Sequence, residues 1–218
     1  TWDQRCYYND SCPADTLSPS YFCGRAPAGC VASCLGQIMR YHSWPPQGTG
    51  SNSYYDADYG TLQADFAATT YNWNAMPDAI YGSHPEIARL MFHIGVATEM
   101  DFGPVASGTG AIDARNALVN YFGYSANAQH VYKSSYSASA WKNLIRGELD
   151  NGRPVFYGGV DVNYGEGHAF VCDGYYGNDY FHFNWGWSGA GNGYFLLNNL
   201  NPLGNANYIN IQEAIIGI

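Results

Sequence analysis

The chain has 218 residues, enough to bury a large core in one domain or in two tightly joined lobes. Charged residues are few, and the formal net charge is −9, so nucleic acid is not an expected partner, because phosphate contacts need clustered Lys and Arg. No apolar run approaches the ~18 residues of a membrane span, and no stretch of the sequence has the pattern expected of a signal peptide. Because the first residue is Thr1 and not Met, we expect that a leader has been removed.

The first predicted helix spans Cys30–His42. Apolar residues recur there at the spacing of one buried helix face: Val31, Cys34, Leu35, Ile38, Met39 and His42. Pro27 and Gly29 disfavour helix before it, and Pro45 stops it. Cys30 should therefore lie on the first turn, where unpaired backbone N–H groups and the helix dipole favour a thiolate.

The rest of the chain predicts helices first and strands afterwards. Residues 45–78 are rich in Gly, Ser, Tyr and Asn and predict mostly loop with short extended pieces. Helices are expected over residues 85–100, 111–122 and 137–151. Short strands are expected over residues 154–160, 168–176, 180–187, 193–198 and 209–216. The fold class is therefore α+β, with a helical N-terminal half and an antiparallel sheet or barrel-like C-terminal half.

The glycine-rich loop over residues 101–110 lacks the lysine of a phosphate loop and follows a helix, so we do not expect it to bind phosphate. The six cysteines contain no CxxC pair, and no second ligand pair completes a zinc site, so no metal or cofactor is expected.

Three cysteines lie in the first 23 residues and predict a disulfide-tied loop in an oxidising compartment. One possible arrangement pairs Cys6 with Cys12 and Cys23 with Cys34. Cys172, inside an apolar run, is predicted to be a buried free thiol.

His168 is the candidate base for a nucleophilic cysteine. It follows flexible glycines at the mouth of a predicted strand, where its side chain can face a cleft. Asn184 and Trp185 come at the end of the next strand, where they are suited to orient an imidazole and shield it from water. The alternative is that this Trp-Gly-Trp turn only caps the sheet.

These residues belong to an ordered set of motifs that resembles the streptopain family, which are secreted bacterial cysteine proteases with a papain-like fold. The set comprises AGCVA at 28–32, QIMRYH at 37–42, YNWN at 71–74, MDFGP at 100–104, FGY at 122–124, GHAFV at 167–171 and FNWGW at 183–187. The motifs occur in the same order over nearly the whole chain.

The resemblance implies a single papain-like, two-lobed peptidase domain over residues 1–218, with a helical lobe over about 1–150 and a sheet lobe over about 151–218. It implies that Cys30 is the nucleophile, that His168 is the general base and acid, and that the Gln4 amide helps to form an oxyanion hole. It also implies that Trp185 and Trp187 lie beside the catalytic histidine. Asn184 lies next to the position where related papain-like enzymes place an orienting Asn.

The resemblance further implies that the loop at residues 106–110 contacts substrate, so the expected substrate-binding residues are Ser107, Gly108, Gly167 and Trp187. A Cys-His ion pair needs the pKa of the thiol to fall from ~8.5 to about 4, which is worth ~6 kcal/mol. A helix N-terminus supplies at most ~2 kcal/mol, so the His168 imidazolium must supply most of the stabilisation.

The expected function is a cysteine endopeptidase that cleaves protein or peptide substrates through an acyl-enzyme. By resemblance, its own pro-segment inhibits it before activation, and an apolar side chain is favoured in the subsite next to the cleavage site. We expect a monomer, secreted or located in the periplasm or at the cell surface.

Two alternatives remain open at this point. The Tyr, Trp, Asn and Gly content is also typical of a secreted protein that binds or cleaves glycans, from which thiol alkylation distinguishes a protease. A protease-like fold serving only as a binding module is disfavoured by the intact Cys30, His168 and Gln4.

Overall fold

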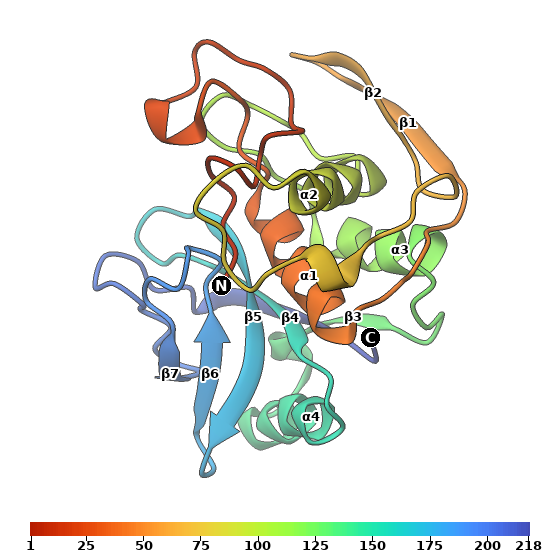
Figure 1. Ribbon diagram of the computed structural model, residues 1–218. Helices are drawn as coiled ribbons and strands as arrows, with labels where there is room; N and C mark the ends of the chain where they lie inside the picture. The colour runs from red at the N-terminus through yellow and green to blue at the C-terminus, as the bar shows by residue number, and fades with distance from the viewer.

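The computed structural model describes residues 1–218, and helix α1 (Cys30–His42) lies at the centre of the molecule (Figure 1). The helix has the predicted bounds because Gly29 caps its start with φ of 86°, and Ser43 ends it in the left-handed conformation. Its apolar face is buried against α2 (Pro85–Ala97), β4 (Val155–Val160) and β5 (Gly167–Tyr176).

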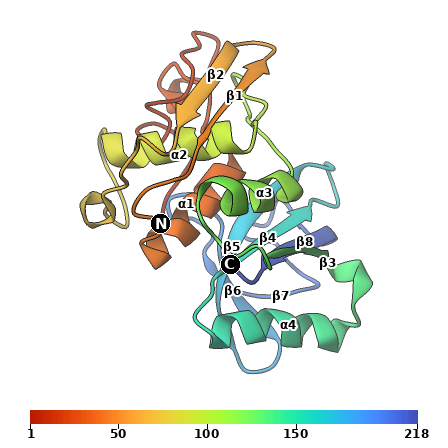
Figure 2. The ribbon, with the colours of Figure 1, turned by 90° about the vertical axis from the view of Figure 1, so that its right-hand side faces the viewer.

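Helix α2 packs beside α1 on the side away from the sheet, as Figures 1 and 2 both show. Helix α3 (Ala111–Tyr121) lies next to α1 and also packs on two strands of the sheet (Figure 2). The predicted helices are confirmed, with α2 three residues shorter than expected at its C-terminal end. An antiparallel hairpin of β1 (Ser51–Asp56) and β2 (Gly60–Asp65) packs on α2, where the sequence predicted mostly loop. Most of its side chains are exposed or half-buried, so the apolar signal of these strands is weak.

The second half of the chain forms the predicted antiparallel sheet, with six strands in the order β3-β8-β4-β5-β6-β7. Besides β4 and β5, its strands are β3 (Gln129–Tyr132), β6 (Tyr180–Asn184), β7 (Gly193–Leu196) and β8 (Asn210–Ile216). Strand β3 was not predicted. Three short 3-10 helices complete the structure: Ser20–Phe22, Trp73–Ala75 and Lys133–Ser135.

The sheet has a hydrophobic core on each face. Phe156, Val171 and Ile215 belong to the larger core, which is built around α1. Tyr157, Phe170 and Ala214 alternate with them along their strands and face the second core, together with Trp141 and Ile145 of α4 (Ala138–Asp150). Both α4 and β3 precede residue 151 and yet lie with the sheet, so the sheet part of the chain begins earlier than the predicted lobe boundary.

The cysteine pairing differs from the predicted arrangement. Cys6 is bonded to Cys23, so the Cys6–Cys12 and Cys23–Cys34 pairs are wrong, although the disulfide-tied N-terminal loop is confirmed. Cys12 and Cys34 are both buried in the larger core, whereas Cys6 and Cys23 lie nearer the surface, where a backbone hydrogen bond joins Cys6 to Tyr21. Cys172 is a buried free thiol, as predicted.

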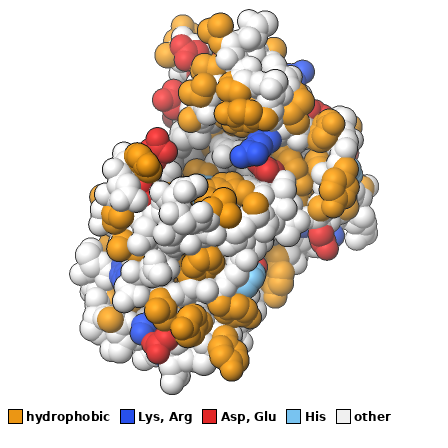
Figure 3. Space-filling model, turned by 90° about the vertical axis from the view of Figure 1, so that its left-hand side faces the viewer, with side chains coloured by type: hydrophobic (Ala, Val, Ile, Leu, Met, Phe, Trp, Pro, Cys, Tyr) orange, Lys and Arg blue, Asp and Glu red, His pale blue; other side chains and the backbone are white.

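Charged side chains are sparse on the face drawn in Figure 3, and hydrophobic side chains are dispersed over it. Tyrosines account for much of the exposed aromatic surface of the molecule; those exposed by more than half include Tyr21, Tyr41, Tyr55, Tyr81, Tyr164, Tyr176 and Tyr194. Every helix is either too short or too polar to cross a membrane.

Candidate active site

Cys30 is the first residue of α1 and is partly buried. Burial raises the pKa of its thiol, and hydrogen bonds from the backbone N–H groups of Ala169, Val31 and Cys30 itself act in the opposite direction. Two of these donors, Val31 and Cys30, have no carbonyl partner within the helix, because they belong to its first turn. The third belongs to β5, so the thiol lies against the strand residue that follows His168.

The loop over residues 101–110 covers the start of α1. A Cβ atom on Gly29 would lie 2.6 Å from Met100 Sδ and 3.0 Å from the Ser107 carbonyl oxygen, so only glycine allows this approach. Asp101 and Gly108 exchange two backbone hydrogen bonds of 2.9 and 3.0 Å, which close the loop. The predicted substrate-contacting loop is therefore held directly beside the candidate nucleophile.

His168 is the second residue of β5, and its Nε2 lies 2.9 Å from the carbonyl oxygen of Trp185. A carbonyl oxygen only accepts hydrogen bonds, so Nε2 donates, and the neutral ring carries its lone pair on Nδ1. The imidazole stacks on Trp187 and Trp185, with ring centroids 4.8 and 6.3 Å apart. Burial lowers the pKa of His168 to about 4, although the bond to Trp185 raises it in part.

Cys30 and His168 line one cavity of about 450 Å³. Its wall is built by α1, the loop over residues 101–110, and strands β4, β5 and β8. Ser107, Gly108 and Gly167, three of the predicted substrate-binding residues, also line it. The fold thus brings residues from both halves of the sequence to one cleft that is large enough for part of a peptide.

The other predicted site residues do not line this cavity. The backbone carbonyl of Gln4 accepts a 2.9 Å bond from the N–H of Ala28, which attaches the N-terminal arm two residues before Cys30. The amide of the Gln4 side chain has no hydrogen-bond partner within the chain. Trp185 is fully buried, and Trp187, half-buried, forms the outer stacking partner of His168.

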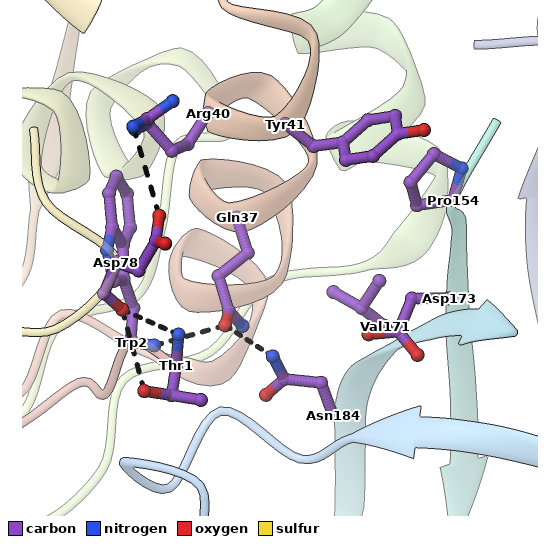
Figure 4. A pocket seen from close by; sticks show the side chains of 10 residues that line it. All are labelled: Thr1, Trp2, Gln37, Arg40, Tyr41, Asp78, Pro154, Val171, Asp173 and Asn184. Atoms are coloured by element: carbon purple, nitrogen blue, oxygen red, sulfur yellow. Dashed lines mark hydrogen bonds and ion pairs between the residues drawn. The ribbon is translucent and has the colours of Figure 1, made fainter. Parts of the chain in front are cut away.

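Asn184 does not hydrogen-bond to His168, although the sequence predicted that it orients the imidazole. Its Nδ2 donates a 2.7 Å bond to Gln37 Oε1, and its Oδ1 accepts a 3.1 Å bond from the N–H of Gly186. Figure 4 shows Asn184 and Gln37 facing each other. The imidazole is held by the backbone carbonyl of Trp185 instead, because β6 ends at Asn184 and the chain then turns at Gly186, where φ is 71°.

Sequence reasoning missed three residues at or near the site: Gln37, Ile211 and Glu213. Gln37 belongs to the QIMRYH motif at residues 37–42, but neither that motif nor the apolar stripe of the helix assigns it a role. Ile211 and Glu213 line the cavity from β8. Their two-residue spacing in a predicted strand indicates that they share one face of the sheet, and this was the signal that could have found them.

No three His, Cys, Asp or Glu side chains are grouped so that they could hold a metal ion.

Comparison with known proteins finds relatives that match the chain over nearly its whole length. The thiol protease/hemagglutinin PrtT of Porphyromonas gingivalis is 40% identical over 232 residues, which cover 100% of this chain and 26% of PrtT. Streptopain of Streptococcus pyogenes is 33% identical over 240 residues, which cover 97% of this chain and 60% of streptopain. The chain thus spans less than two thirds of these curated relatives.

A solved structure of the active wild-type interpain A cysteine protease of Prevotella intermedia superposes with a TM-score of 0.91 at 33% identity, covering 100% of this chain and 91% of that one. A prointerpain A fragment from the same organism superposes with a TM-score of 0.86, and the match covers 100% of this chain and 69% of the fragment. The α+β, papain-like fold predicted from the sequence is therefore confirmed. The model of the Peptidase C10 family matches residues 2–195, and the resemblance seen in the sequence is correct: this chain belongs to the Peptidase C10 family.

Proposed function

We propose that this chain is a cysteine endopeptidase in which Cys30 is the nucleophile and His168 is the general base and acid. The observation that carries the proposal is their position in one cavity, with His168 held by Trp185 so that Nδ1 is the proton acceptor. The thiol protease and cysteine protease relatives support the same chemistry. None of the comparisons supports the glycan alternative.

In the proposed reaction, Nδ1 of His168 takes the thiol proton, and the Cys30 sulfur attacks the carbonyl carbon of a peptide bond. The resulting oxyanion accepts hydrogen bonds from the backbone N–H of Cys30 and from the Gln4 amide, each worth ~3 kcal/mol. The imidazolium then protonates the leaving amine, and the C–N bond breaks. Water, deprotonated by the imidazole, attacks the thioester and releases the acid and the free thiol.

The electrostatics support a requirement for both residues. Burial raises the pKa of Cys30 and lowers that of His168, so each residue alone is neutral near pH 7. A thiolate and an imidazolium in contact stabilise each other most where the surroundings exclude water. The stacked indoles of Trp185 and Trp187 exclude water from one face of the imidazole.

Finer features of the function are proposed on narrower grounds. Protein or peptide substrates fit a cleft of this volume, and the solved prointerpain A fragment supports synthesis with a pro-segment, which we propose inhibits the enzyme before activation. The Cys6–Cys23 disulfide supports an extracellular or cell-surface location, because disulfides persist in oxidising compartments. We propose one peptidase domain over residues 1–218, acting as a monomer.

The decisive test is casein cleavage by the Cys30→Ala variant. We expect cleavage to fall by at least about 10³-fold, because the nucleophile is lost while the fold is kept. Cys172→Ala is the matched control, since it removes a buried thiol on the far face of the sheet. Circular dichroism should show that both variants are folded. Undiminished cleavage by Cys30→Ala would reject the proposed mechanism.

A further inference from the structure

Glu213 places a carboxylate in the wall of the cavity that holds Cys30 and His168. Its Oε2 lies 2.6 Å from Nε2 of His130, which donates because an ionised carboxylate only accepts. Its Oε1 has no hydrogen-bond partner within the chain. The Glu213 side chain is 24% exposed and lines the cavity, so its carboxylate can be reached from the cleft.

Gly158 makes room for this carboxylate. Gly158 and Glu213 are paired across β4 and β8, and both line the cavity. A Cβ atom on Gly158 would lie 3.0 Å from Cγ and 3.1 Å from Oε1 of Glu213. The glutamate side chain therefore lies over a strand position without a side chain, and this keeps its head at the cavity surface.

A β-bulge places an apolar side chain next to this carboxylate. The pairing of β4 with β8 shifts between Gly158 and Val160, so Ile211 and Gln212 together oppose Gly159. Ile211 has φ of 44°, a conformation that is strained for a β-branched residue, and it is 66% exposed while lining the cavity. Such strain is concentrated at functional positions, where it directs a side chain toward a ligand.

The charges of the cavity favour a cationic ligand. The residues that line it include two carboxylates, Asp101 and Glu213, and no Lys or Arg. The only other titratable side chains among them are those of Cys30 and His168. A carboxylate in a partly enclosed wall interacts more strongly with a cation than one that is surrounded by water.

We propose that Gly158, Ile211 and Glu213 form a subsite that selects a Lys or Arg side chain of the peptide substrate. The inference rests on the proposed peptidase function. The aliphatic stem of the substrate side chain packs along Ile211, and its charged head donates to Glu213 Oε1. The apolar preference implied by the family resemblance is thus retained for the stem, and the carboxylate adds a requirement for positive charge at its end.

The test uses a peptide library in which Lys and its uncharged analogue norleucine are scanned through each position around the scissile bond. We expect Lys to exceed norleucine in kcat/KM by about 10-fold at one position only, the effect of one charge-assisted hydrogen bond. Glu213→Gln should bring this ratio close to 1, because the amide keeps the size of the side chain and removes its charge. His130 can still bond to the glutamine, so the variant is expected to fold.

Asp101→Asn is the matched control, because it removes one negative charge from the same cavity. Its Lys-to-norleucine ratio should stay within about twofold of that of the unmodified protein. Equal losses in both variants would show a general field of the acidic cleft and overturn the subsite. An unmodified protein that prefers norleucine at every position would also overturn it, whereas absence of any Cys30-dependent cleavage would reject the proposed function itself.

Discussion

Gly29 precedes the candidate nucleophile with φ of 86°, a backbone conformation that side chains with a Cβ atom rarely adopt. It also lies where a Cβ would meet Met100 Sδ at 2.6 Å and the Ser107 carbonyl oxygen at 3.0 Å. Two physical costs therefore coincide at this position. One is the local conformational strain, and the other is displacement of the loop that covers Cys30.

We expect Gly29→Ala to lower the free energy of unfolding by more than about 2 kcal/mol, as measured by urea denaturation. Peptidase activity should fall further than the folded fraction does, because the loop over residues 101–110 must move. Gly24→Ala is the control: φ there is 72°, but no atom lies within 4 Å of the added Cβ. If both variants lose the same stability and neither loses activity, the contact with the loop is unimportant.

At the residue scale, the sequence was most informative where a motif has a direct chemical meaning. Cys30 after a helix-breaking glycine, and His168 after glycines at a strand mouth, were the residues that the sequence proposed as a pair, and both line one cavity. The cysteine pairing was not, because spacing along the chain does not determine which thiols meet in space. The roles of Ile211 and Glu213 depend on a bulge and on Gly158 in the neighbouring strand, and neither can be recognised from β8 alone.

Among the elements, α1 is joined through Gln37 to the N-terminal arm and to the end of β6. The Oε1 atom of Gln37 accepts a 3.1 Å bond from the N–H of Trp2 and a 2.7 Å bond from Asn184 Nδ2. Gln37 also lines a second cavity of about 410 Å³, shown in Figure 4. One oxygen thus positions the N-terminal arm, which carries Gln4, and the end of β6, which leads to Trp185.

We expect Gln37→Leu to reduce kcat of the proposed peptidase by about 10-fold or more, with a smaller change in KM. The variant leaves two donors unpaired, which costs about 1–3 kcal/mol each where they are buried. Gln37→Glu keeps the acceptor and should retain most of the activity. The pH profile of kcat/KM should also shift in the Leu variant. Loss of the bond to Asn184 frees the end of β6, and the next residue, Trp185, holds His168. An unchanged profile with intact stability would show that Gln37 does not position the site.

Helix and strand prediction followed the strength of the apolar pattern. The helix at residues 30–42 and the strands around Phe156 and Phe170 have continuous buried faces, and these elements were found nearly to the residue. The hairpin at residues 51–65 was predicted only as short extended pieces within a loop, because its side chains are mostly exposed. Strand β3 has only four residues and is specified by its pairing with β8, which no local pattern reveals.

On the scale of the whole molecule, the cleft depends on packing between the helical half and the sheet. The α1 helix and the inner face of the sheet share one core, so the distance between Cys30 and His168 depends on global stability. His93 is a buried, titratable part of this core region. Its Nδ1 lies 3.0 Å from the hydroxyl oxygen of Tyr71, and the ring packs edge-on against Phe66.

Burial lowers the pKa of His93 to about 4, compared with ~6.5 for an exposed imidazole. Between these values the unfolded chain binds a proton that the folded chain does not, so the free energy of unfolding rises with pH. The contribution of His93 to the free energy of unfolding is complete above pH 6.5 and is lost as pH falls toward 4. The difference between its two pKa values corresponds to about 3 kcal/mol.

We therefore expect urea denaturation to show a marked loss of stability between pH 6.5 and 4, and the His93→Gln variant to lose less stability over that range. The slope of the free energy of unfolding against pH is the readout, because the variant also changes packing, which shifts stability at every pH by a similar amount. His168 adds to the slope in the same direction, because burial lowers its pKa to about 4 as well. A His93→Gln variant with the full slope of the unmodified protein would assign the acid sensitivity to other groups.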